Sequence, residues 1–444
     1  MEIDPKSAST GEGGEGALNT TFELNREIIT NEGEDYEEKR AALKLGYWKS
    51  AVLLFQGTVG LSMFTLQKPL AMVGLYWGFI LTIIIGYITC YGLVRLSNLS
   101  AEIETDLRMK RKIKNFDELT RNIEGKHVPF IKGLMMFAAV MMMYSSTVSN
   151  ILLITMNLNS HLGLNEDLIK AIIFVVITFM LLFMVEPEKI QYINLYMTLL
   201  LISLAYILFA KNTYIAVTGN GPKFEDIPKV GWKATGVYSG NVAYAFEVAS
   251  NYLSLRLTSS IDVNYSALTS TLMVFIGLNF YICAAANLFA YAPNKVTENA
   301  LEMHAKTGIF WQYLIYAFMV NTLYTFTFNT IFTCEIIESI PAIADRISDG
   351  KGVFDRKKLI GIRIALWAAA VGISMVAKNI IMILNVSGSV FTPIVSYFGP
   401  LILFYTYKSQ KSMSVSPAQK LHDAVYVLIA ITVSIWGIIN TFDL

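Results

Sequence analysis

Residues 75–97 read LYWGFILTIIIGYITCYGLVRLS and carry a single charge, Arg95. A helix of about 20 apolar residues is long enough to cross the hydrocarbon core of a bilayer. The whole chain is 54% hydrophobic and only 16% charged, whereas about a quarter of the residues in soluble domains are charged. Because backbone groups inside a bilayer must be satisfied within their own segment, the sequence predicts helices that span a membrane.

Similar apolar runs recur along the chain. We predict an all-α polytopic membrane protein of about eleven spans, at residues 48–73, 75–97, 131–158, 167–186, 190–211, 235–256, 265–292, 309–338, 359–377, 380–406 and 422–441. Residues 408–444 form a linker and the last span.

The N-terminal segment 1–46 has a different composition. Residues 1–40 hold eleven acids and four bases, and GEGGEG occupies 11–16. This composition is typical of a disordered acidic tail. We expect the tail to be a place where a protein partner with a basic surface binds.

The charges between the predicted spans indicate the orientation. With the N-terminus inside, the inner segments hold eighteen Lys and Arg residues and the outer segments seven. Positive charge is retained on the cytoplasmic side, or on a matrix-like side. No N-x-[ST] sequon lies in an outer loop. This favours an intracellular membrane, such as that of a vacuole or lysosome or the mitochondrial inner membrane, with the plasma membrane as the alternative.

Two blocks of five spans, 48–211 and 235–406, are similar in length and opposite in orientation. Two blocks of this kind indicate an inverted repeat. In such a repeat, the first helix of each block is interrupted near the midplane and binds the substrate there. The first block carries Gly57-Thr58-Val59-Gly60-Leu61-Ser62 in mid-span. These small residues are candidates for a substrate site, and close helix packing is the alternative explanation.

The second block contains an acid, Glu247, inside its first span. A buried carboxylate in a membrane must be paired, protonated or functional. We interpret this span as the second half of the substrate site, with a purely structural hydrogen bond as the alternative. The candidate residues here are Ala243, Ala245, Phe246, Glu247, Ser250 and Asn251.

The eighth predicted span carries a ladder of polar residues. Asn321, Thr322 and Thr325 are candidates, together with Glu247, for coupling transport to an ion. Hydrogen bonding between helices is the alternative explanation of the ladder, and the one we favour. Neither a catalytic motif, a metal-binding motif nor a cofactor motif is present, and nothing indicates nucleic-acid binding. The sequence therefore argues against an enzyme.

Four stretches resemble the amino acid/auxin permease family. The first span reads QGTVGLSMFTLQKPLAMVGLYWG, with Gly57, Gly60 and Gly74 on family glycines, and the sixth reads VAYAFEVASNYLSLR, with Phe246 and Glu247 matching. The eighth ends in CEIIE, and Arg363 and the Gly388…Pro400 spacing match the closing segment. The similarity covers most of 45–407, which makes 47–407 a transporter-like core.

The resemblance implies a LeuT-type fold of five plus five helices with one extra. It also implies coupled transport of small amino acids or similar zwitterions, driven by H⁺ or Na⁺. The substrate carboxylate would face N–H groups near Gly60, Leu61 and Ser62, and the amino group would face carbonyls at Ala243 to Phe246.

Several helix breakers of the family pattern are replaced here. Ser62 and Val248 stand at glycine positions and Gln67 at a proline position. The β-branched Val248 resists the positive φ angles that glycine permits. These departures motivate a second hypothesis, in which the fold serves as a structural or accessory subunit of a larger membrane complex without transport activity.

Overall fold

The computed structural model describes residues 45–109, 111–183, 187–304, 308–338, 340, 343, 356–377 and 379–441, so nearly all of the predicted acidic tail 1–46 lies outside the described residues. Within them the chain is helical, and strand-type pairing is limited to one isolated bridge between Leu45 and Ser259. The predicted all-α class is confirmed.

The two spans predicted to be interrupted are each divided. The first contains α2 (Tyr47–Thr58), the short 3₁₀ helix η1 (Leu61–Phe64) and α3 (Gln67–Val73), and the sixth contains α9 (Thr235–Ala245) and α10 (Ala249–Thr258). The other long helices are α4 (Leu75–Asp106), α6 (Val128–Leu162), α7 (Glu166–Phe183), α8 (Pro187–Val217), α11 (Tyr265–Ala290), α12 (Ile309–Glu338), α14 (Arg356–Val376) and α17 (Pro417–Thr441).

Several of these helices have the length and composition of membrane spans. In the described residues, six helical stretches are apolar enough to cross a bilayer, at Leu75–Asp106, Val128–Leu162, Leu195–Val217, Tyr265–Ala290, Ile380–Gln410 and Pro417–Thr441. Their exposed faces carry large apolar residues such as Ile83, Val274 and Leu428. The chain is therefore an integral multi-pass membrane protein.

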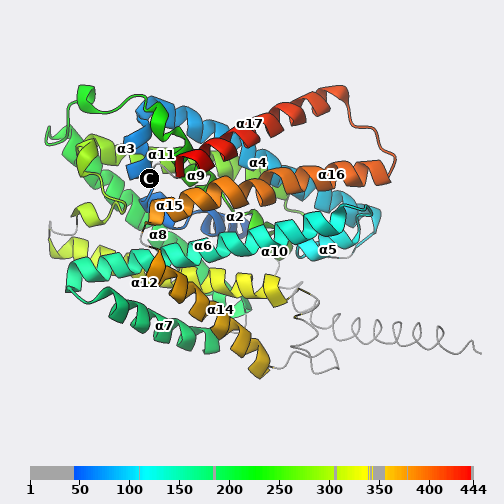
Figure 1. Ribbon diagram of the computed structural model, residues 1–444, viewed down its shortest axis with the longest axis horizontal. Helices are drawn as coiled ribbons and strands as arrows, with labels where there is room; N and C mark the ends of the chain where they lie inside the picture. The colour runs from blue at the N-terminus through cyan, green and yellow to red at the C-terminus, as the bar shows by residue number, and fades with distance from the viewer. Residues whose placement is uncertain are drawn as a thin grey trace, which may run out of the picture.

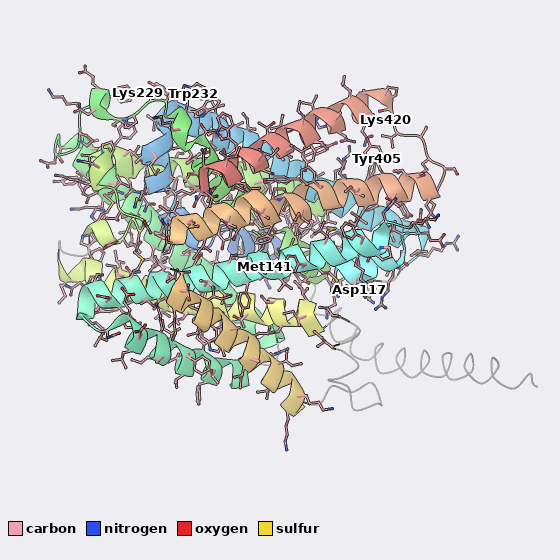
Figure 2. All side chains as sticks on the ribbon, in the orientation of Figure 1. Asp117, Met141, Lys229, Trp232, Tyr405 and Lys420 are labelled. Carbon is pink, nitrogen blue, oxygen red and sulfur yellow. The ribbon has the colours of Figure 1, made fainter. Side chains whose placement is uncertain are left out.

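The helices form one bundle in which α17 packs against α9, and α7 packs against α14 on the other side of α6 (Figure 1). Figure 2 places Asp117, on the short helix α5 (Phe116–Arg121), at the opposite end of the bundle from Lys229 and Trp232. At the Trp232 end, the rings of Trp77 and Trp232 lie 4.5 Å apart. The bundle thus has two distinct ends.

The tenth span is less regular than the sequence predicted. It begins as α15 (Ile380–Val386), widens into two π-type segments, η6 (Ser387–Phe391) and η7 (Pro393–Phe398), and continues as α16 (Gly399–Gln410). Prolines at 393 and 400 remove two backbone donors from this stretch. Wide turns of this kind are frequent at functional sites.

Two glycines bring the tenth span into contact with α9. A Cβ atom added to Gly388 would lie 1.8 Å from the carbonyl oxygen of Gly240, and one added to Gly240 would lie 2.0 Å from Oδ1 of Asn385. Only residues without a side chain permit this approach of the two backbones. The contact holds the π-type segments beside the broken sixth span.

We predict that Gly388→Ala destabilises the protein by about 1–3 kcal/mol, because the added methyl group overpacks this contact. Gly133→Ala on α6 is the matched control, since its Cβ meets nothing within 4 Å and alanine is the better helix former. Thermal unfolding of the purified protein in detergent checks both variants. A melting temperature of Gly388→Ala equal to that of the native protein would contradict the prediction.

Candidate functional site

The first span is unwound just after Thr58. Val59 has φ −90° and ψ 92°, and Gly60 has φ −111° and ψ −127°, so neither residue continues the helix. The N–H of Val59 bonds to the carbonyl of Phe55, but the N–H groups of Gly60, Leu61 and Ser62 find no acceptor among the described residues. The break therefore leaves three backbone donors available.

The sixth span is unwound at residues 246–248. The N–H of Phe246 bonds to the carbonyl of Val242 and that of Glu247 to the carbonyl of Tyr244. The described backbone supplies no donor to the carbonyls of Ala243 and Ala245. Unpaired carbonyls at a helix C-terminus carry the negative end of its dipole.

A cavity lies between the two breaks. It contains about 500 Å³ of empty volume counted to its open side. Its walls come from the first span, the sixth span, α6 and α12; in Figure 2, Met141 marks the turn of α6 next to it. The lining residues are Gln56, Gly57, Thr58, Gly60, Ser62, Met142, Met143, Ser146, Asn150, Tyr244, Glu247 and Thr325.

The two glycines of the first break have different surroundings. A Cβ on Gly57 would lie 2.9 Å from Cδ1 of Leu255 and 3.3 Å from Cγ2 of Val248, so Gly57 permits close packing on the sixth span. Gly60 has nothing within 4 Å. Gly57 thus agrees with the close-packing explanation, whereas Gly60 has open space around it.

Glu247 is the acid of the cavity, and its side chain is only 7% exposed. Its Oε1 accepts hydrogen bonds from the backbone N–H of Ser250 at 2.9 Å and from Oγ of Ser250 at 3.0 Å. Its Oε2 accepts a hydrogen bond from Oγ of Ser396 in η7. No Lys, Arg or His of the described residues forms an ion pair with it, and its partners are neutral donors.

A chain of polar side chains reaches the cavity from α8. Oγ1 of Thr198 donates to Oε1 of Gln56 at 2.6 Å, and Nε2 of Gln56 donates to Oγ1 of Thr325 at 3.3 Å. The other candidates on α12 point elsewhere. Asn321 donates to the carbonyl of Met197, and Thr322 donates to the carbonyl of Phe318. Of these ion-coupling candidates on α12, only Thr325 lines the cavity.

The predicted substrate residues divide into two groups. Gly57, Thr58, Gly60, Ser62 and Glu247 line the cavity, although the hydroxyl of Thr58 donates to the carbonyl of Leu54.

The others stand behind the cavity wall. Phe246 packs on Phe280, Ser250 holds Glu247, and Asn251 donates to Sδ of Met143. Ala243 and Ala245 are fully buried in α9. The side chain of Leu61 lies outside the described atoms.

Several lining residues were not predicted. Met143, Ser146 and Asn150 share one face of α6 because they lie three and four residues apart. That spacing is visible in the sequence, but nothing there indicates that this face meets the breaks. Ser396 was missed because the tenth span was expected to be an ordinary helix.

A loop covers the first break at the Trp232 end. The N–H of Ala300 bonds to the carbonyl of Phe64, and Nε2 of Gln67 bonds to the carbonyl of Thr297. Nζ of Lys68 pairs with Glu298 at 3.0 Å. Gln67 and Lys68, which replace a family proline and its neighbour, therefore bind this loop.

His304, in the same loop, is fully buried. Its Nε2 donates to Oδ1 of Asn212 at 2.9 Å, its Nδ1 accepts from the hydroxyl of Tyr291 at 3.1 Å, and its ring stacks on Trp311. Burial, and to a lesser extent the positive charge of Lys211, lowers the pKa of His304 from 6.5 to about 4. The folded protein therefore holds this imidazole neutral.

Comparisons with known proteins find a family match. The family model described as "Transmembrane amino acid transporter protein" matches residues 44–443. Among curated proteins, no sequence matches.

Two solved structures share the fold. One is a Na⁺-coupled sialic acid symporter in a substrate-bound outward-open state, at 12% identity over 91% of each chain with a TM-score of 0.55. The other is a nucleobase-cation-symport-1 family transporter in a closed conformation with bromovinylhydantoin bound, at 12% identity over 90% of this chain and 91% of that one, TM-score 0.54. The expected LeuT-type fold is confirmed.

We predict that lowering the pH from about 7 to about 5 costs about 2 kcal/mol of stability through His304. The unfolded chain takes up a proton near pH 6.5, whereas the folded chain resists protonation until about pH 4. Stability is thus lost as the pH falls through this window. Thermal unfolding of His304→Gln at both pH values should show a flatter dependence than the native protein, whereas the exposed His127→Gln should not. Parallel slopes for all three proteins would refute this assignment.

Proposed function

This chain belongs to the transmembrane amino acid transporter protein family, and we propose that it carries out secondary active transport of amino acids or similar small zwitterions. Family and fold support a secondary transporter. The observation that carries the finer proposal is the pair of helix breaks that border one cavity, with free backbone donors on one side and a buried acid on the other.

The first break supplies the groups for a carboxylate. Gly60 and Ser62 line the cavity, and the N–H groups of residues 60–62 have no acceptor in the described chain. Backbone donors at a helix terminus bind anions well because they carry partial positive charge and need no reorganisation. We assign the substrate carboxylate to this side.

The sixth span supplies the groups for an amine. Glu247 lines the cavity, and the carbonyls of Ala243 and Ala245 are available one turn behind it. A charged carboxylate that is 7% exposed and contacts neutral donors needs a compensating cation. We propose that two cations neutralise the carboxylate of Glu247 one after the other. One is the ammonium group of the substrate, and the other is the coupling ion, H⁺ or Na⁺.

A second candidate function rests on the apolar part of the lining. Met142, Met143 and Tyr244 border the cavity. A structural or accessory subunit that has lost transport would keep the fold and fill its site in this way. Under this alternative the protein co-purifies in stoichiometric amounts with a larger membrane complex.

We further propose that the N-terminus lies on the cytoplasmic or matrix side of an intracellular membrane, where its acidic tail meets a protein partner. The support is the distribution of positive charge along the sequence. Protease digestion of sealed organelles with an N-terminal epitope tag tests the orientation.

We predict that the protein, reconstituted in liposomes, accumulates labelled amino acids under an inward H⁺ or Na⁺ gradient. Glu247→Gln should abolish gradient-driven accumulation by removing the charge that the coupling ion compensates, while preserving hydrogen bonds with Ser250 and Ser396. Comparing the two gradients identifies the ion.

Glu225→Gln is the matched control, because Glu225 is an exposed acid in the short 3₁₀ helix η2 (Phe224–Asp226) far from the cavity. This variant should transport at the native rate. Folded native protein that neither accumulates nor exchanges any amino acid under either gradient would refute the transport proposal and favour the accessory subunit.

A further inference from the structure

A second cavity lies at the Asp117 end of the bundle, where α4 ends and α11 begins. It is larger than the first, with about 1070 Å³ of empty volume counted to its open mouth. Its charged lining consists of Arg108, Arg111, Lys112 and Arg256 against one acid, Glu104. None of these residues takes part in the proposed transport site.

The single acid is already compensated. Nη1 and Nη2 of Arg256 bond to the two carboxylate oxygens of Glu104 at 2.5 and 2.8 Å, and the N–H of Ile113 bonds to the same carboxylate. Arg256 is only 4% exposed, so this ion pair forms the buried base of the cavity.

Of the other bases, Arg111 pairs with Glu118 at 2.7 Å, and Lys112 donates to Oγ of Ser259 and to the carbonyl of Ser260. The lining itself still carries four bases against one acid.

Arg108 is the most available of these bases. It is exposed, and within the described part of the chain no carboxylate pairs with it. Its backbone has φ of 50°, a left-handed conformation that glycine adopts more easily. The N–H groups of Arg108 and Met109 close the C-terminus of α4 by bonding to the carbonyls of Thr105 and Glu104. The helix end thus holds this arginine at the cavity.

The opposite wall offers backbone donors. Asn264 caps α11 through the N–H of Ala267, but the N–H groups of Tyr265 and Ser266 have no acceptor among the described residues. Both residues line the cavity. Tyr265 also has a buried hydroxyl without a partner in the described structure, and its side chain is 3% exposed.

Phosphate oxygens accept hydrogen bonds from guanidinium groups, from ammonium groups and from free N–H groups at a helix N-terminus. This cavity offers donors of all three kinds. We propose that this cavity binds a phosphate group, carried by an anionic lipid headgroup or by a soluble phosphate compound. Ile261, which is 66% exposed, and Val263 place apolar side chains beside the basic ones, as an amphipathic ligand requires. Bound phosphate would link the end of α4 to the start of α11.

The test uses the full-length protein in phosphatidylcholine nanodiscs. One arm adds phosphatidic acid as a minor lipid, with phosphatidylserine, another negatively charged lipid, for comparison. The other arm titrates inorganic phosphate. The readouts are the shift of the melting temperature and native mass spectrometry of retained lipid. A shift in the lipid arm alone identifies a headgroup, and a shift with inorganic phosphate identifies a soluble ligand.

Arg108→Gly removes the charge and suits the left-handed backbone, so this variant should fold. Lys112→Gln is the second variant, and its amide retains a donor for Oγ of Ser259. Each variant should bind phosphate roughly tenfold more weakly than the native protein, because it loses one hydrogen bond from a charged donor. Lys126→Gln, an exposed base outside the cavity, should bind as the native protein does.

Absence of a shift in both arms overturns the proposal. Native-like binding by Arg108→Gly also overturns it, because the affinity would then come from diffuse charge at this end of the protein. If Lys112→Gln fails to fold, Arg108→Gly alone decides between these results.

Discussion

Every backbone N–H and C=O group at membrane depth needs a partner, and at two places in this chain the helix does not supply one. Residues 60–62 keep their donors free, and residues 243 and 245 keep their acceptors free. Lipid cannot satisfy such groups, so the unwound backbone must face protein or a polar cavity. At the first break it faces a cavity that also contains Glu247, and at the sixth span the carbonyls of Ala243 and Ala245 lie buried behind the wall of that cavity.

The packing around the breaks holds them side by side. Gly57 lets the first span touch Val248 and Leu255 of the sixth, and Gly388 lets the tenth span touch Gly240. Through the second contact, the π-type segment η7 places Ser396 against the carboxylate of Glu247. The scaffold and the site therefore share residues, which explains why glycines that resemble packing positions also determine where the acid lies.

The apolar runs predicted the helices because their length and hydropathy reflect the bilayer itself, and both breaks were anticipated from Gly60 and Glu247. Val248 was expected to resist unwinding, but the chain unwinds there with φ −142° and ψ −2°, so the break does not require the positive φ that glycine adopts most readily. The π-type turns and the α6 face were not predicted, because the first depends on backbone pairing along the tenth span and the second on which helix meets the cavity. Periodicity within one helix carries no information about its neighbours.

The central claim is that the two breaks together bind the substrate. Hydrogen–deuterium exchange of the protein in nanodiscs, with and without a mixture of the proteinogenic amino acids, tests it directly. The account predicts slower exchange of the amides at 60–62 and around 246–248 when the mixture is present, with α7 and α14 unchanged. Unaltered exchange at both breaks, in protein shown to be folded and to transport amino acids, would contradict the account.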